Sequence, residues 1–315
     1  MTIQDALKLH PDAEVLLPLL FEERARVRRD RAWFFAHTEY VLTKYQEPNF
    51  KKLITKRRAD WPAAYITGHK EFFGLDFLVN RNVLIPRPET ELLVELALQG
   101  ISNPESRIAN VIDIGTGSGN IIISLAKQSP SPLARGNAPK GQRGQAKFFA
   151  TDSSAKALAV ARVNTRRHGM AKKIKFLRGN LLSPFLQATN YKLIPNLILA
   201  NLPYGWKEWK NNTSAETSGL RFEPQQALFT KEGGLYLIRK LFEQIKIICH
   251  SGLDPESIQK NLDSRFRGND ITILLEFDPR QKSALTKLAK KYFPAAKLTF
   301  HRDLARRWRV MKITI

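Results

Sequence analysis

The chain contains one cysteine, Cys249, among its 315 residues, and no apolar run approaches the ~18 residues that a membrane-spanning helix needs. A single cysteine excludes an internal disulfide and a cysteine-rich metal site, and it fits a reducing compartment. The six histidines show no spacing typical of metal ligands, so we expect no metal. The N-terminal stretch lacks the early cations and the cleavage site of a signal or transit peptide. We therefore expect a cytoplasmic protein that makes no membrane contact.

Acidic residues are also scarce. The chain has 29 Asp and Glu against 51 Lys and Arg, which gives a formal net charge of +22. Such a balance favours an anionic partner such as RNA or the ribosome, but it is equally typical of a surface that only keeps a protein in solution. Both interpretations stay open, and we expect at most a weak contact with RNA or the ribosome through the basic surface.

The apolar pattern divides the chain into three parts, in line with a length that favours two domains. Residues 1–62 carry apolar side chains every three to four positions, which predicts a small helical domain. Residues 63–92 are rich in aromatic and β-branched residues and are broken by glycines, which predicts a β-hairpin and a linker. Residues 93–315 alternate short apolar runs with helical stretches, which predicts an α/β domain with a mainly parallel sheet.

Seven strands and four longer helices are expected in the α/β domain. Only a short link separates the last two strands, so they should pair antiparallel. The expected strands are 111–115, 147–152, 174–179, 196–201, 271–277, 297–303 and 308–315, and the helices are 119–128, 154–168, 233–248 and 280–292. Two polar segments containing Gly and Pro, 129–145 and 250–270, interrupt the alternation, and we interpret both as flexible insertions without function.

A glycine-rich turn, "VIDIGTGSGN", follows the first strand of this domain and precedes a helix. Glycine at such a turn lets the backbone approach a ligand closely, and Asp152 at the end of the next strand can bind a pair of ribose hydroxyls. Both features serve NAD and S-adenosylmethionine, and a plain turn is a further alternative. The candidate cofactor-binding residues here are Asp113, Gly115, Thr116, Gly117, Ser118, Gly119 and Asp152.

A polar corner, "NLPY", ends the fourth strand. The side-chain oxygen of Asn201 and the carbonyl of Leu202 can each accept one N–H bond from a planar NH2 group. Pro203 biases Leu202 toward an extended backbone, and Tyr204 offers a flat face for stacking. This pattern predicts a site that positions an amide or a base for methyl transfer, although a strand-ending turn would look similar. The four residues 201–204 are called the corner below.

Together these motifs resemble the HemK/PrmC family of class-I S-adenosylmethionine-dependent methyltransferases, which modify the glutamine N5 of peptide chain release factors. The likeness is carried by "IPRPETE", "VIDIGTGSGNIIISLA", the corner, "RFEPQQALFTKEGGLYLIRKL" and "HRDLARRWRVMKI". It implies a seven-stranded Rossmann-like sheet with the last strand antiparallel, and a monomer whose helical domain helps to hold the release factor. The Gly-Gly-Gln loop of that partner would reach the corner.

The resemblance also implies roles for individual residues. Asn201, Pro203 and Tyr204 would be catalytic, and Leu202 and Glu223 would join them in binding the substrate. Asn180 and Leu181 would lie beside the adenine pocket, and Asn201 would also contact the cofactor.

Three positions depart from the family pattern. Leu202 replaces a proline, Asn180 replaces an acidic residue, and Asp278 stands where glycine is usual and is interpreted as structural. We expect the amide site to survive the first change with less rigidity, and the second to lower cofactor affinity. Trp206 and Trp209 would line the substrate channel or anchor the loop after the corner.

Two other functions stay open. "NLPY" as written is typical of ribosomal RNA adenine N6-methyltransferases, in which the same geometry holds an adenine amino group. Against this, about 110 residues precede the glycine-rich turn, and "IPRPETE" is foreign to those enzymes. A catalytically inactive adaptor that only binds cofactor or a translation factor is the third interpretation.

Overall fold

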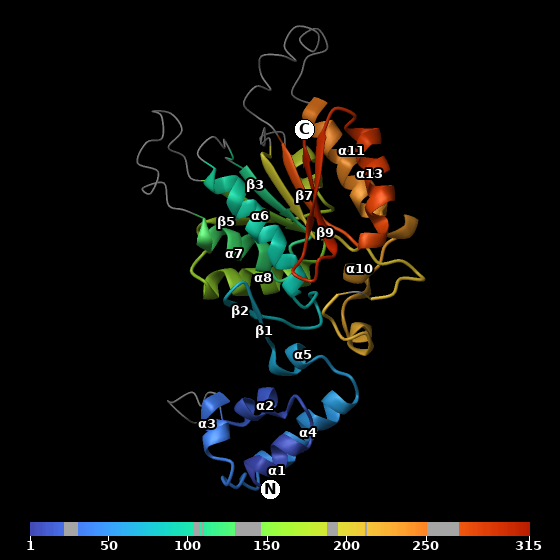
Figure 1. Cartoon of the computed structure of the whole chain (residues 1–315). Helices are drawn as coiled ribbons and strands as arrows, with labels where there is room; N and C mark the ends of the chain where they lie inside the picture. The colour runs from blue at the N-terminus through green and yellow to red at the C-terminus, as the bar shows by residue number, and fades with distance from the viewer. Residues whose placement is uncertain are drawn as a thin grey trace.

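The computed structural model describes residues 1–21, 31–103, 108, 110–129, 146–187, 195–211, 213–250 and 271–315. Apart from Ser129 and His250, the two predicted insertions lie outside these ranges, and their lack of function stays a prediction. Figure 1 shows a helical part at the N-terminal end and a larger α/β part that contains the C-terminus, joined through a small hairpin.

Short helices form the N-terminal part around a core of its own. Thr2 caps the first of them, because its hydroxyl accepts the Asp5 N–H while the Asp5 side chain binds the Thr2 N–H. Ile3, Leu16 and Phe50 are fully buried at the centre. The helices are α1 (Ile3–Lys8), α2 (Ala13–Leu16), η1 (Leu17–Leu20), α3 (Arg31–Ala36), α4 (Gln46–Arg58) and α5 (Ala63–Thr67).

The predicted hairpin is formed by β1 (His69–Phe72) and β2 (Leu75–Leu78), which pair antiparallel. Its two turn residues, Phe73 and Gly74, both have positive φ, the backbone that a tight two-residue hairpin turn needs. The chain then runs through residues 79–87 into η2 (Pro88–Thr90) and α6 (Glu91–Ser102). This linker lies beside the carboxyl ends of the sheet strands, as the cavity contacts below show.

The predicted α/β fold is confirmed. Seven strands form one sheet in the order β5-β4-β3-β6-β7-β9-β8, in which only β9 runs against its neighbours. The strands are β3 (Asn110–Ile114), β4 (Lys147–Asp152), β5 (Ile174–Arg178), β6 (Leu197–Ala200), β7 (Thr272–Glu276), β8 (Lys297–Arg302) and β9 (Trp308–Thr314). The strand order reverses between β3 and β6, and in such sheets ligands bind in the crevice beyond the carboxyl ends at this point.

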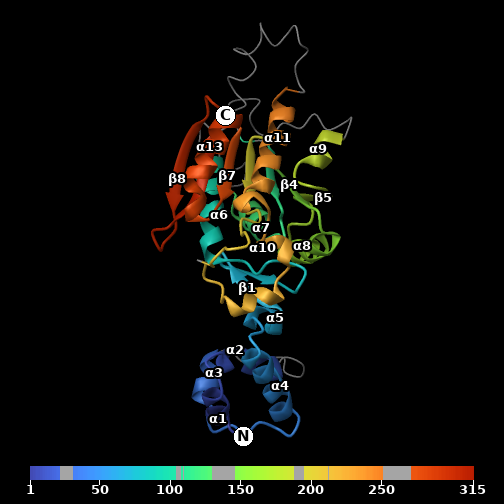
Figure 2. The same cartoon turned by 90° about the vertical axis from the view of Figure 1, so that its right-hand side faces the viewer.

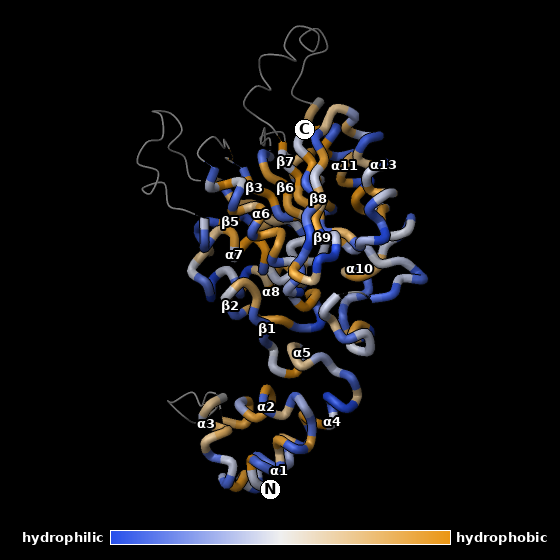
Figure 3. Tube along the Cα trace, in the orientation of Figure 1, coloured by the Kyte–Doolittle hydropathy of each residue, from blue (hydrophilic) through white to orange (hydrophobic). Residues whose placement is uncertain are grey.

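Side chains of the central strands alternate between two hydrophobic layers. Ile112 on β3 and Ile198 on β6 face the layer of α11 and α13, whereas Val111 and Leu199 face the layer of α6 and α7. Figure 3 shows the strands as a hydrophobic band inside the α/β part. The helices are α7 (Asn120–Gln128), α8 (Ala155–Arg167), α9 (Ser183–Gln187), α10 (Gln225–Leu228), α11 (Tyr236–His250) and α13 (Lys282–Tyr292). None of the helices within the described ranges is long and apolar enough to cross a membrane.

The segment between β6 and α11 bridges the two parts of the molecule. Arg57 at the end of α4 binds Glu216 at 2.9 Å, and the ring of Trp61 packs on that of Phe222 with centroids 4.7 Å apart. Figure 2 shows this segment, with α10, lying beside the hairpin and α5. Three short elements form this segment before α11: η4 (Ser218–Phe222), α10 and η5 (Glu232–Gly234). Further along the chain, η6 (Pro279–Gln281) precedes α13.

Candidate active site

A cavity of about 280 Å³ opens at the carboxyl ends of β3, β4 and β6, at the point where the strand order reverses. It brings together most of the predicted site residues from segments far apart in the chain. These are Gly115, Thr116, Gly117, Ser118, Asp152, Asn180, Leu181, Asn201, Leu202 and Pro203. Asp113, Gly119, Tyr204 and Glu223 do not line this large cavity.

The glycine-rich turn forms one wall of the large cavity. The N–H groups of Gly115 and Thr116 both bind the carbonyl of Thr151, which closes the turn over β4. Gly119 has φ +81°, and a Cβ there would lie 2.8 Å from the Ile123 side chain. Glycine is therefore required at this position both by backbone conformation and by the packing of α7.

Asp113 lies beneath this turn and is fully buried. Its Oδ2 accepts a hydrogen bond from the Thr116 hydroxyl at 2.7 Å, and its Oδ1 has no partner within the described part of the chain. Burial raises the pKa of Asp113 to about 7. The residue thus supports the turn from below through its hydrogen bond with Thr116.

Asp152 lies next to this turn, at the end of β4, and also lines the large cavity. Its Oδ2 accepts the Gly117 N–H at 3.0 Å and its Oδ1 accepts the Ser154 N–H at 2.8 Å, while burial raises its pKa. A carboxylate has four lone-pair sites, so two remain for a ligand such as a ribose hydroxyl pair. The exposed Asn180 and the buried Leu181, which has φ +55°, line the same cavity.

The corner separates the large cavity from a smaller one of about 20 Å³, which Asn201, Leu202 and Pro203 also line. Asn201 Nδ2 donates to the Thr90 hydroxyl at 3.0 Å. No donor among the described residues binds Asn201 Oδ1 or the Leu202 carbonyl, and Pro203 has no N–H. The corner therefore presents free acceptors and can bind a group that carries N–H donors.

Tyr204 is buried and lines the small cavity. Its hydroxyl donates to Glu276 Oε1 at 3.1 Å, and burial raises its pKa well above the usual range. Gln281 Nε2 donates to the Tyr204 carbonyl at 2.9 Å, and a Cβ on Gly234 would collide with that carbonyl. The tyrosine is thus fixed at both its backbone and its hydroxyl end.

The loop after the corner is anchored on Asp278. Trp209 Nε1 donates to Asp278 Oδ2 at 2.8 Å, and the Trp209 ring contacts that of Tyr204 edge-on and lines the small cavity. Although burial opposes it, hydrogen bonding from Arg280 lowers the pKa of Asp278. The Arg280 guanidinium also lies over the Trp206 ring at 4.8 Å. Trp209 therefore both anchors this loop and lines a cavity.

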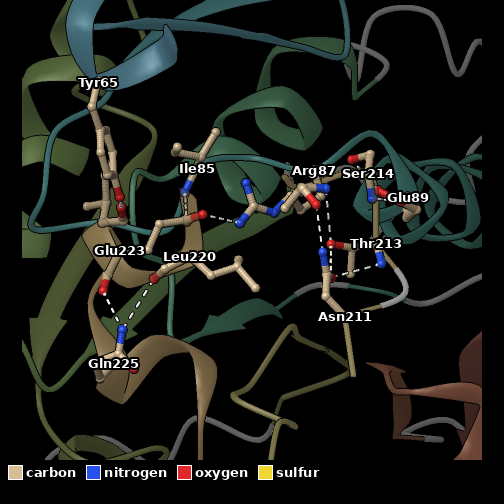
Figure 4. Close-up of polar contacts among 12 residues, drawn as sticks. Tyr65, Ile85, Arg87, Glu89, Asn211, Thr213, Ser214, Leu220, Glu223 and Gln225 are labelled. Atoms are coloured by element: carbon tan, nitrogen blue, oxygen red, sulfur yellow. Dashed lines mark hydrogen bonds and ion pairs between the residues drawn. The ribbon is translucent and has the colours of Figure 1, made fainter. Parts of the chain in front are cut away.

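Glu223 ties the linker to the segment after the corner (Figure 4). Its carboxylate is buried and binds the Ile85 N–H at 3.0 Å and the Arg87 guanidinium. Nearby, the Glu89 carboxylate accepts from the N–H and the hydroxyl of Ser214. Glu223 touches neither cavity, whereas Arg87 lines both. The contacts of Glu223 therefore give it the role of holding Arg87 in place.

The comparisons with known proteins agree with this geometry. Family models described as "PrmC N-terminal domain" and "Methyltransferase domain" match residues 3–68 and 106–262. The release factor glutamine methyltransferase of Koribacter versatilis is 35% identical over 216 residues, 69% of this chain and 69% of that protein. Its namesake from Dictyoglomus turgidum is 30% identical over 292 residues, 91% of this chain and 86% of that protein. The chain belongs to the release factor glutamine methyltransferase family.

This membership confirms the resemblance that the motifs predicted. Of the departures from the family pattern, Leu202 is buried, with a methyl group 3.4 Å from where a Gly115 Cβ would lie. Its side chain thus packs against the glycine-rich turn while its carbonyl stays free of protein donors in the described ranges. Asn180 is exposed at the rim of the large cavity.

Three residues that face the corner were missed by reasoning from the sequence: Arg87, Thr90 and Glu276. The first two lie within the "IPRPETE" phrase that carried the family resemblance, but their partners lie far along the chain. Glu276 ends β7, which pairs with the strand that leads into the corner. The sequence could have indicated Glu276, because it is an acidic residue at the carboxyl end of a predicted strand, where ligand sites of such sheets lie.

Replacing Asp113 with asparagine should stabilise the fold in a pH-dependent way. A folded pKa near 7 against an ordinary 3.8 means that the folded chain binds the proton more tightly. Stability is therefore lost as pH rises from about 4 to 7, by roughly 4 kcal/mol. The asparagine side chain would keep an oxygen for the Thr116 hydroxyl and lose this penalty.

Urea unfolding at pH 5 and pH 8 measures this effect. The advantage of Asp113→Asn over the wild type should be larger at pH 8. An equal advantage at both pH values would show that Asp113 does not hold its proton as described.

Proposed function

We propose that the chain transfers a methyl group from S-adenosylmethionine to the side-chain amide nitrogen, N5, of the glutamine in the Gly-Gly-Gln motif of peptide chain release factors. The observation that carries this proposal is the pair of unpartnered acceptors, Asn201 Oδ1 and the Leu202 carbonyl, at the boundary between two cavities in the described part of the chain. The family membership supplies the substrate class, since the relatives are named release factor glutamine methyltransferases.

The large cavity suits S-adenosylmethionine. Asp152 keeps lone pairs for a ribose, Asn180 and Leu181 border the wall where an adenine would lie, and the glycine-rich turn leaves room beside its backbone. When bound, S-adenosylmethionine supplies an electrophilic methyl group on a sulfonium. The Asp113 carboxyl, with its pKa of about 7, lies beneath the turn and contributes negative potential on the same side of the site in its ionised form.

The corner would prepare the amide for the transfer. A carboxamide NH2 has two donors, one for Asn201 Oδ1 and one for the Leu202 carbonyl, so the nitrogen lone pair stays perpendicular to the amide plane. Holding the partners in place in this way contributes up to roughly 7–11 kcal/mol in the best-oriented reactions. After the new N–C bond forms, the nitrogen loses one proton to solvent, and no covalent enzyme intermediate is needed.

The size of the small cavity favours a side-chain amide over a nucleobase. At about 20 Å³, and lined by Tyr204, Trp209 and Leu228, it is about the size of one water molecule, so it has room only for the end of a slender side chain. A fused two-ring adenine would have to displace the anchored Trp209 and the doubly fixed Tyr204. This argues for glutamine rather than adenine as the recipient.

The helical part would bind the protein substrate. We divide the chain into a recognition domain at 1–62, a hairpin and linker at 63–92 and a methyltransferase domain at 93–315, acting as a cytoplasmic monomer. The salt bridge between Arg57 and Glu216 supports a substrate-binding role for the helical part, because it connects the helices to the segment that borders the corner.

The basic surface supports a weak contact with RNA or the ribosome. No acidic residue occurs between 153 and 207, and eight exposed cations lie on and around α8 and the edge strand β5. They are Lys156, Arg162, Arg166, Arg167, Lys172, Lys173, Lys175 and Arg178. Changing Arg166, Lys172 and Lys173 to glutamate should weaken RNA binding and flatten its salt dependence, as filter binding at two salt concentrations measures. Unchanged binding would remove RNA as a partner of this surface.

A labelling experiment tests the proposed function. Purified protein is given methyl-labelled S-adenosylmethionine with a release factor, with ribosomal RNA, or with both. We expect label on the release factor only. Label on the RNA alone would favour the adenine methyltransferase, and cofactor binding without any transfer would favour an adaptor.

A further inference from the structure

Arg87 brings a positive charge to the boundary between the two cavities. The residues that border both the large and the small cavity are Leu84, Arg87, Asn201, Leu202, Pro203 and Ala227. Arg87 is the charged side chain in this set. Under the proposed function the amide nitrogen meets the methyl donor at this boundary, so Arg87 lies where it can contact the amide.

The Arg87 guanidinium keeps N–H groups for a ligand. Its Nη2 donates to Glu223 Oε1, whereas Nε and Nη1 bind no acceptor among the described residues. The side chain is only 7% exposed, yet none of its nitrogens is both enclosed and without a partner in these ranges. The Nε and Nη1 groups therefore open onto space, and Arg87 borders both cavities. An arginine carries five N–H donors, so one bond to Glu223 leaves several for a ligand.

The corner supplies acceptors for an amide but no donor for its oxygen. Asn201 Oδ1 and the Leu202 carbonyl suit the two N–H groups of a carboxamide, and Asn201 turns its own NH2 toward Thr90. Pro203 has no N–H to offer. A carbonyl oxygen that is buried without a donor is costly, so the bound amide needs a donor beside the corner. Arg87 lies at that place and has N–H groups available.

We infer that Arg87 is a substrate-binding residue that donates a hydrogen bond to the side-chain carbonyl oxygen of the recipient glutamine. The inference rests on the proposed function, because it needs a carboxamide at the corner. The amide then has a partner at every polar atom: two acceptors of the corner for its NH2, and Arg87 for its oxygen. A primary amine has no such oxygen, so the site selects a carboxamide over an amine.

Glu223 makes a cation acceptable at this position. The sulfonium of the cofactor is positive, so an unpaired guanidinium at the same boundary would repel it. The buried Glu223 carboxylate binds the guanidinium directly and offsets its charge, while the other N–H groups stay available (Figure 4). The pair can therefore donate hydrogen bonds without adding net charge beside the sulfonium.

Loss of the guanidinium should raise KM rather than lower kcat. The amide oxygen accepts the bond both before and during the transfer, so the contact stabilises the bound substrate and the transition state alike. The test uses Arg87→Met with Glu223→Gln, which leaves no unpaired carboxylate and keeps an oxygen for the Ile85 N–H. We expect KM for the release factor to rise by about 10- to 100-fold, with kcat and the Kd for S-adenosylhomocysteine within about threefold. A fall in kcat at unchanged KM would overturn the inference.

Arg87→Lys is a second variant that keeps a cation opposite Glu223. An ammonium is a single point charge, whereas the guanidinium directs separate N–H groups to two partners. We expect Arg87→Lys to stay folded and to raise KM by about 10-fold. A wild-type KM in this variant would show that the charge alone matters, and would overturn the assignment.

A double-mutant cycle across the complex identifies the partner of Arg87. The release factor is used in its natural form and with the glutamine of the Gly-Gly-Gln motif replaced by methionine, which has a similar length and no amide. Calorimetry measures its binding to protein loaded with S-adenosylhomocysteine and needs no turnover. The paired change Arg87→Met and Glu223→Gln should weaken binding of the glutamine form by about 10- to 100-fold and leave that of the methionine form within about threefold.

The outcomes separate the role of Arg87 from the proposed function. Equal losses for the two forms, with the wild type still methylating the release factor, would overturn the inference and leave the proposed function standing. If no methyl group is transferred but binding of the glutamine form alone depends on Arg87, the proposed function fails and the binding role of Arg87 stands.

Discussion

Replacing Asn201 with alanine should lower kcat for release-factor methylation by about 10²–10³-fold, while the Kd for S-adenosylhomocysteine changes by less than about threefold. The variant loses the one side-chain acceptor that the corner offers to the amide. The Thr90 hydroxyl beneath it also loses its donor. Because an amide is a weak nucleophile, its reactivity depends on orientation and desolvation more than on contact area. Turnover should therefore suffer more than cofactor binding.

Steady-state kinetics with a release factor and calorimetry with S-adenosylhomocysteine measure the two effects separately. Gln99→Ala removes a carboxamide at an exposed position of α6 that lines neither cavity; it serves as the control and should leave both quantities unchanged. Equal losses in turnover and in cofactor affinity would mean that Asn201 serves the cofactor rather than the amide.

The second large effect is expected at Arg87. Arg87 is 7% exposed and its partner Glu223 is 4% exposed, so Arg87→Met leaves a buried carboxylate without its cation (Figure 4). Breaking a buried pair in this way costs about 3–5 kcal/mol of unfolding free energy. Because Glu223 also binds the Ile85 N–H, the loss should loosen the linker that borders both cavities.

Urea unfolding of a small set of variants tests this pair. Adding Glu223→Gln to Arg87→Met should recover most of the stability, because glutamine keeps an oxygen for the Ile85 N–H without a charge. Arg221→Met removes the exposed ion pair with Asp60 and should cost less than about 1 kcal/mol. If Arg87→Met costs no more than Arg221→Met, the buried pair does not hold the linker.

Much of the α/β fold could be predicted from local patterns. Each sheet strand coincides with a short apolar run, and the glycines at 115, 117 and 119 mark the turn that binds a cofactor in this class of sheet. The short connection between β8 and β9 required an antiparallel pair, which the structure contains. These features depend on residues that are close together in the sequence, so they can be predicted from the sequence alone.

The fixing of the corner could not be predicted in the same way. The hydrogen bond from Asn201 to Thr90 spans 111 positions, and that from Tyr204 to Glu276 spans 72. No local pattern specifies such a contact, because it exists only after the linker, β6 and β7 have come together. The burial of Asp113 beneath the turn and the pairing of Glu223 with Arg87 depend on packing for the same reason.

Fragmentation mass spectrometry of a release factor treated with the protein and methyl-labelled S-adenosylmethionine tests the central claim most directly. The account predicts one added methyl group on the side-chain nitrogen of the glutamine in the Gly-Gly-Gln peptide, and none when Asn201→Ala is used. A methyl group on another residue of the release factor, or on that glutamine at an undiminished rate with Asn201→Ala, would contradict the account.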